Sequence, residues 1–184
     1  MTMLSKGKIT NTAITLTYGT TATVKAKAEG KTTISVKNRN IVSLTSSGKL
    51  TPKNTGVTTL TVKAAATSKY EARSKTFTVI VLPKKETVTY AKSLKAKQLT
   101  VKWKKDTKAT GYQIQYSTSN RFTAKTTKTI TVKKNRTTSQ TIKKLSAGKK
   151  YYVRVRAYKT MKISGKNVNK YGAWSARKTV SVKR

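Results

Sequence analysis

Apolar residues recur at every second position in several short runs of this sequence, and the residues between them are mostly Thr, Lys, Gln or Arg. Successive side chains of a β-strand point to opposite faces of a sheet, so this alternation predicts half-buried strands. No stretch shows the 3.6-residue spacing of a long amphipathic helix. The runs lie at 14–18, 24–28, 34–36, 60–64 and 77–81 in the first half, and at 99–103, 112–116, 130–132, 151–157 and 180–182 in the second.

Turn-forming residues separate these runs, and many short strands at such spacing favour a sandwich or a barrel. Pro83 and the polar residues 84–86 interrupt the alternation near the middle of the chain. Because proline is disfavoured inside a central strand, we place a domain boundary there. The chain therefore consists, on this interpretation, of two small all-β domains.

The charge of the chain is extreme. It contains 42 Lys and Arg residues against 4 acidic residues, which gives a net charge of +38. With a mean hydropathy of −0.56 this composition is typical of disordered chains, but the regular alternation argues for folded strands. The excess charge is above the magnitude of about 2–8 that suffices to keep a small domain soluble.

The residue types that carry most enzyme chemistry are missing or dispersed. There is no His and no Cys, and the four acids lie far apart in the sequence, at Glu29, Glu71, Glu86 and Asp106. Acid–base catalysis, zinc sites and calcium sites draw mainly on these types. We predict a non-enzymatic protein with no metal site, no cofactor and no small-molecule substrate; a lysine acting as base or nucleophile is the remaining enzymatic alternative.

The second half resembles a fibronectin type III domain. Residues 99–103 (LTVKW) resemble strand B with its buried Trp, residues 111–116 (GYQIQY) strand C, and residues 151–157 strand F. Residues 145–151 (LSAGKKY) resemble the tyrosine corner of such sandwiches, and residues 172–175 (GAWS) resemble the start of strand G. The resemblance implies that the Tyr151 hydroxyl bonds to nearby backbone. The Arg-Gly-Asp tripeptide of the family is absent, so integrin adhesion is not implied.

Residues 9–82 resemble the bacterial immunoglobulin-like (Big) domains that occur in tandem on surface adhesins. The segment 41–62 carries the resemblance best, but Ile34 and Val36 occupy the strand where that family usually has a Trp. The two resemblances together imply two tandem immunoglobulin-like β-sandwiches, at 1–83 and 87–184. They also imply a monomeric part of a larger secreted, extracellular or cell-wall-associated bacterial protein. No apolar run approaches the ~20 residues of a transmembrane segment.

The charge predicts an anionic partner, because self-repulsion destabilises a compact cationic domain and a polyanion relieves it. We expect non-specific electrostatic binding to an anionic polymer: teichoic acid, a sulfated glycan, DNA, RNA or anionic lipid. The candidate contact residues are Arg154, Arg156, Lys133, Lys134, Arg136, Lys149, Lys150, Lys162 and Lys166.

Trp174 is a candidate cation–π platform for Arg154 and Arg156, which are two positions apart on one predicted strand. Two interpretations stay open: an aromatic, cationic face for a glycan or phosphate chain, or a structural ladder that holds strand G. The segment 159–170 matches the F–G loop, which is either a binding loop or a variable hairpin. We expect Tyr112, Tyr116 and Tyr151 to be core residues rather than surfaces for base stacking.

Three alternative functions remain. The modules are passive spacers, or the charge itself is the function, in a protein that associates with nucleic acid or enters cells. The third alternative is a protein-binding adhesin, whose interface would resist salt.

Overall fold

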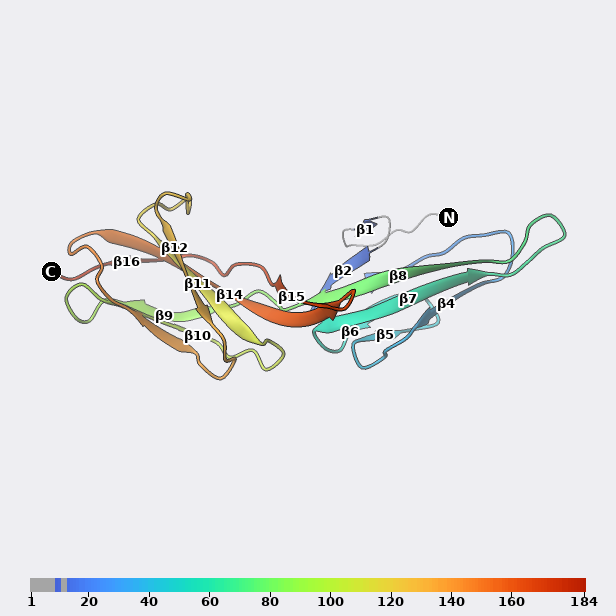
Figure 1. Ribbon diagram of the computed structural model, residues 1–184, viewed down its shortest axis with the longest axis horizontal. Coiled ribbons are helices and arrows are strands. Elements are labelled where there is room, and N and C mark those ends of the chain that lie inside the picture. Colours follow the sequence, from blue (N-terminus) through green and yellow to red (C-terminus); the bar gives the residue numbers. More distant parts are fainter. Residues whose placement is uncertain (1–8, 11–12) are drawn as a thin grey trace. The chain divides into compact units, whose positions relative to one another are not determined.

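The computed structural model describes residues 9–10 and 13–184, and every regular element in them is a β-strand (Figure 1). The predicted all-β fold is confirmed. The chain divides into two compact units, of which the first comprises Met1–Leu82 and Met161–Val168 and the second Pro83–Thr160 and Asn169–Arg184. The part of the chain that the structure describes contains no helix that could span a membrane.

The first unit contains two β-sheets. The larger sheet has the strand order β1-β2-β8-β7-β4, and the smaller has the order β3-β6-β5. β2 and β8 pair in parallel, whereas the other neighbours pair antiparallel. The strands are β1 (Ile9–Thr10), β2 (Ala13–Thr17), β3 (Ala22–Thr23), β4 (Thr32–Val36), β5 (Val42–Leu44), β6 (Lys49–Pro52), β7 (Gly56–Ala64) and β8 (Arg73–Leu82).

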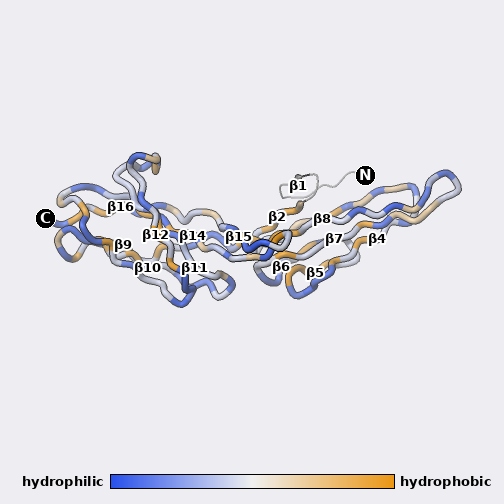
Figure 2. Tube along the Cα trace, viewed as in Figure 1, coloured by the Kyte–Doolittle hydropathy of each residue, from blue (hydrophilic) through white to orange (hydrophobic). Residues whose placement is uncertain are grey.

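The core of the first unit follows the alternation in the sequence. On β8, Phe77, Val79 and Val81 are buried, and on β7 Leu60 and Val62 are buried, with more exposed residues between them. Fully burying such a side chain is worth about 1.5–3 kcal/mol, so the alternation decides which face of each strand packs inward. Figure 2 shows the hydrophobic colouring along strands such as β2 and β9, with the turns mostly hydrophilic.

The strand predicted over 24–28 is wrong, because regular pairing stops at Thr23. The Val24 N–H donates to the Gly48 carbonyl oxygen at 2.9 Å, outside the β3–β6 ladder. Beyond it, Ala26 is half-buried and Ala28 is exposed. Alanine buries little apolar area, so the alternation here offers little packing energy to hold a strand in place.

The second unit also contains two sheets. One has the order β13-β10-β9; the other has the order β12-β11-β14-β15, and β16 pairs with β14 as well. The strands are β9 (Val88–Lys92), β10 (Leu99–Trp103), β11 (Gly111–Ser117), β12 (Thr127–Val132), β13 (Ser139–Ile142), β14 (Lys150–Ile163), β15 (Lys166–Tyr171) and β16 (Lys178–Ser181). Residues 161–168, at the end of β14 and the start of β15, belong to the first unit.

Aromatic side chains fill the core of the second unit. Trp103 packs edge-on against Tyr112, with ring centroids 5.3 Å apart, and both are buried. Tyr151 is also buried, and half-buried Tyr116 packs against the core, so these tyrosines are core residues as predicted. The Tyr151 hydroxyl accepts a hydrogen bond from the Ser146 N–H at 3.2 Å, which confirms the predicted tyrosine corner.

Two predictions near the C-terminus can be compared with the structure. The segment 159–170 is a β-hairpin, one of the two interpretations left open above, since β14 runs to Ile163 and β15 begins at Lys166. Its two turn residues, Ser164 and Gly165, have φ values of 49° and 82°; two consecutive positive φ values suit the twist of a tight hairpin. The segment 172–175 does not start a strand, because it lies between β15 and β16.

Candidate functional site

Two arginines and three aromatic rings form an alternating stack on the second unit. We call it the arginine ladder, and its members in order are Phe122, Arg154, Trp174, Arg156 and Tyr171. The Arg154 Cζ lies 4.0 Å from the Phe122 ring centroid and 4.6 Å from that of Trp174. The Arg156 Cζ lies 4.3 Å from the Trp174 centroid and 4.0 Å from that of Tyr171. Each guanidinium therefore lies between two rings, and Trp174 serves both.

The neighbouring strand β11 fixes the plane of each guanidinium. In the β11–β14 register, Gln115 lies opposite Arg154 and Gln113 lies opposite Arg156. Gln115 Oε1 accepts hydrogen bonds from Nε and Nη2 of Arg154 at 2.9 and 2.7 Å. Gln113 Oε1 accepts the equivalent pair from Arg156 at 3.1 and 2.7 Å. These paired hydrogen bonds restrict the rotation of each guanidinium group.

Trp174 reaches the ladder because the chain leaves regular pairing between β15 and β16. The Gly172 N–H still donates to the Ala157 carbonyl at 3.0 Å, and the Ser175 N–H donates to the Val155 carbonyl at 2.8 Å. The Ser175 hydroxyl accepts a hydrogen bond from the Val155 N–H at 3.0 Å. The Ser175 side chain thus takes the place of a backbone carbonyl as the acceptor for Val155 of β14. The bend at this point places the Trp174 indole next to both arginines.

The ladder keeps its positive charge. Burial lowers the pKa of Arg154 and of Arg156, and the neighbouring Arg156 lowers the pKa of Arg154 further. Arginine nonetheless stays protonated in proteins. The side-chain acceptors of both guanidinium groups are neutral glutamine amides, which satisfy donors but cancel no charge. All five ladder residues are half-buried, so a ligand can still approach the edges of the stack.

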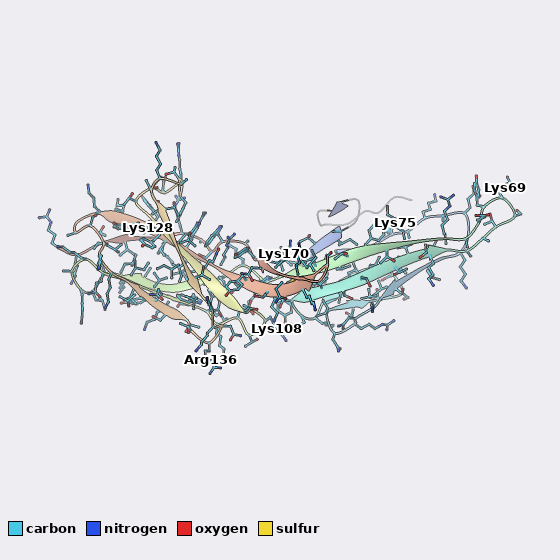
Figure 3. All side chains as sticks on the ribbon, in the orientation of Figure 1. Lys69, Lys75, Lys108, Lys128, Arg136 and Lys170 are labelled. Atoms are coloured by element: carbon cyan, nitrogen blue, oxygen red, sulfur yellow. The ribbon has the colours of Figure 1, made fainter. Side chains whose placement is uncertain are left out.

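The structure brings together two of the predicted contact residues, Arg154 and Arg156, with the predicted cation–π platform Trp174. The others are exposed and lie on several segments. Figure 3 shows basic side chains projecting from many strands and loops, with Lys128 and Arg136 on opposite sides of the second unit in this view. The remaining predicted residues are Lys133, Lys134 and Arg136 between β12 and β13, Lys149 before β14, Lys150 and Lys162 on β14, and Lys166 on β15.

Reasoning from the sequence missed four residues of the ladder and its support. Tyr171 and the glutamines 113 and 115 have a weak signal, because they occupy outward positions of strands next to the two arginines. Phe122 has none, since it lies in the β11–β12 connection, with a φ of 53° and its N–H bonded to the Ser119 carbonyl.

Two acidic side chains are buried in the second unit. Glu86 and Asp106 are 4% and 3% exposed, and Glu86 Oε1 and Asp106 Oδ2 have no hydrogen-bond partner. Burial, and then the charge of Asp106, raise the pKa of Glu86 to about 7, whereas Lys84 lowers it. These residues are twenty positions apart in sequence, so the pair is visible only in the fold. Among the described residues, no group of three or more His, Cys, Asp and Glu side chains could hold a metal ion.

Comparison with known proteins finds one known domain within the chain. The fibronectin type III domain family matches residues 83–169, and no curated protein matches the chain. The crystal structure of the chicken CNTN1 FN1–FN3 domains is 16% identical, with a TM-score of 0.45 over 97% of this chain and 65% of that one. A structure titled "Myokine structure" is 22% identical, with a TM-score of 0.42 over 55% of this chain and 99% of that one. The chain thus spans about 65% of the length of the CNTN1 structure.

Proposed function

We propose that this chain, which carries a fibronectin type III domain at residues 83–169, is a non-enzymatic adhesion or structural module that binds anionic polymers. Fibronectin type III domains occur in extracellular parts of larger proteins. In the proposal, residues 1–83 are a bacterial immunoglobulin-like domain and residues 87–184 the fibronectin domain. The whole is a monomeric part of a bacterial surface or cell-wall protein.

The observation that carries the proposal is the uncompensated charge of the arginine ladder. Each of its two guanidinium groups is held by a neutral glutamine, and both arginines are only half-buried. Guanidinium groups suit phosphate and sulfate because they combine charge with a planar fork of donors.

The placement of the acidic residues adds support. Glu86 and Asp106 are buried, so only Glu29 and Glu71 face solvent against 42 basic residues. Polymers such as teichoic acid, sulfated glycans, DNA or RNA would neutralise this surface and release their counterions.

The test is binding of the whole chain to teichoic acid, heparin, duplex DNA and an uncharged glycan across a salt series. We expect the three polyanions to bind and their affinity to fall linearly on a double-logarithmic salt plot. The double variant Arg154→Gln/Arg156→Gln should flatten that slope by about two contacts.

A matched control is Lys133→Gln/Lys134→Gln, which removes the same charge from an exposed loop. If both double variants lower the affinity equally, the charge acts without a defined site. If the chain binds none of the three polyanions, or if its affinity for them does not change with salt, the binding proposal is wrong.

A second candidate, a passive spacer, is favoured by one observation. The faces of both guanidinium groups and two nitrogens of each are already occupied within the domain, so the ladder also has a purely structural explanation. The variant Arg154→Lys/Arg156→Lys separates the two, because it keeps the charge and loses the forked, stacked geometry. A spacer loses stability in this variant while its weak polyanion binding stays unchanged.

A further inference from the structure

A cavity of about 630 Å³ lies at one end of the first unit, between residues 27–30 and the β7–β8 connection. This volume is within the range of about 300–1,000 Å³ typical of sites for small ligands. Alanines 28, 64 and 65 form part of its wall, and their small side chains leave the space open. The functional groups that line it are Lys27, Glu29, Lys69, Tyr70, Glu71 and Arg73.

Short contacts hold the two walls of this cavity together. The Ala65 N–H donates to the Lys31 carbonyl at 2.9 Å, and a Cβ at Gly30 would lie 2.1 Å from the Ala65 carbonyl oxygen. The β7–β8 connection is closed by Thr67, whose N–H donates to the Tyr70 carbonyl at 2.8 Å and whose Oγ1 accepts from the Tyr70 N–H at 3.1 Å. The ring of Tyr70 therefore projects from a defined turn.

The composition of the cavity is unusual for this chain. Tyr70 is 60% exposed, which makes it one of the large hydrophobic residues that the described fold leaves in solvent. Glu29 and Glu71 are two of only four acidic residues in the whole sequence, and both line this one cavity. An exposed aromatic ring offers a flat apolar face with a polar hydroxyl. Carboxylates accept hydrogen bonds from hydroxyl groups, and Lys and Arg donate to ligand oxygens.

These groups match a sugar better than a polyanion or a metal ion. A sugar ring has an apolar face for Tyr70 and hydroxyl groups that both donate and accept. A polyanion would meet the two carboxylates, and a divalent cation would meet the basic side chains of Lys27, Lys69 and Arg73 with only two carboxylates to hold it. The mixture of acceptors and donors therefore points to an uncharged ligand rich in hydroxyls.

We propose that this cavity is a binding site for a neutral oligosaccharide, with the sugar stacked on Tyr70 and its hydroxyls bonded to Glu29 and Glu71. The site lies in the first unit and is independent of the arginine ladder. If the protein acts at a cell surface, the cavity adds recognition of uncharged sugars to attraction by charge.

In the experiment, the whole chain is titrated at about 1 M salt with chitotriose, cellotriose and maltotriose in turn. NMR and calorimetry measure the binding. The Debye length is about 3 Å at that salt, which suppresses electrostatic binding of polyanions. Oligosaccharide binding and polyanion binding are therefore tested separately, and either proposal can fail without the other. We expect at least one trisaccharide to bind with a dissociation constant at or below about 1 mM. The NMR chemical-shift changes should be confined to residues 27–30 and 64–73.

Three variants test the assigned contacts. Tyr70→Ala and Glu71→Gln should each weaken binding about tenfold or more, a difference of about 1.4 kcal/mol, while Tyr70→Phe keeps the stacking ring and most of the affinity. Tyr90→Ala, in the second unit, is the control and should bind like the unaltered chain. All four variants are compared by circular dichroism to establish that they fold. No saturable binding of any trisaccharide, or binding that Tyr70→Ala leaves unchanged, would overturn the proposal.

Discussion

Ser175 and Val155 exchange two hydrogen bonds, one through backbone and one through a side chain. The Ser175 N–H donates to the Val155 carbonyl at 2.8 Å, and the Val155 N–H donates to the Ser175 hydroxyl at 3.0 Å. Val155 is fully buried, so its N–H has no access to water if the hydroxyl is removed. This single side chain joins the bend before β16 to the centre of β14.

Ser175→Ala should therefore lower the free energy of unfolding of the second unit by about 1–3 kcal/mol, the cost of a buried unsatisfied donor. Both tryptophans of the chain, Trp103 and Trp174, lie in this unit, so urea unfolding followed by tryptophan fluorescence reports on it alone. The control is Ser181→Ala, at an exposed position of β16. Equal stability of the two variants would show that water or another group replaces the hydroxyl.

Trp174→Ala should remove the shared ring of the arginine ladder and with it two of the four cation–π contacts. Each contact is worth about 0.5–1 kcal/mol, and lost burial adds to this, so we expect a loss of about 1–3 kcal/mol. Chemical denaturation followed by the fluorescence of Trp103 measures it. Arg154→Ala in the Trp174→Ala background should cost less than Arg154→Ala alone, because the partners form one network. Additive losses would mean that the ring and the guanidinium act independently.

The second unit should be less stable at neutral pH than near pH 4. The pKa of Glu86 is about 7 in the folded state, against an ordinary value of 4.5 in the unfolded chain. Below pH 4.5 the carboxyl is protonated in both states. Between pH 4.5 and 7 the unfolded chain releases the proton first, so the free energy of unfolding falls, by about 3 kcal/mol in total. Urea unfolding at several pH values measures this decline.

Glu86→Gln should abolish most of that decline and stabilise the second unit at pH 7. Glu29→Gln, at an exposed position of the first unit, is the control and should leave the decline in place. The chain has no histidine, so no histidine contributes to the change in this interval. A decline of the same size in Glu86→Gln would place its origin elsewhere.

Moderate salt should raise the melting temperature of the chain. A net charge of +38 produces repulsion that screening weakens, since the Debye length is about 8 Å at 0.15 M and about 30 Å at 0.01 M. Calorimetric melts between these two concentrations test this. A melting temperature that stays constant would show that the charges are too dispersed to affect stability.

Much of the fold was predictable because it depends on one local rule. The alternation at 99–103 and 151–157 predicts strands whose inward residues form the core, and the structure has β10 and β14 there. The rule fails where packing energy is small, as at Ala26 and Ala28, and where turn chemistry decides, as at Ser164 and Gly165. Regular spacing alone does not separate a long hairpin from a loop.

The site was predictable only in part. Arg154, Arg156 and Trp174 follow from the resemblance of their segments to a known fold, but Phe122 joins them through a connection that no local pattern describes. The partners Gln113 and Gln115 depend on the register between β11 and β14. The pairing of Glu86 with Asp106 likewise depends on strands brought together by folding, so sequence spacing conceals it.

The glutamine acceptors of the arginine ladder have one more consequence. Glutamine does not titrate, and guanidinium groups stay charged across the physiological range, so acidity changes neither side of these contacts. A surface of this kind resembles a strong anion exchanger, whose capacity does not depend on the acidity of the medium. If the arginine ladder binds anionic polymers as proposed, its contribution to binding should depend on salt and not on pH across the physiological range.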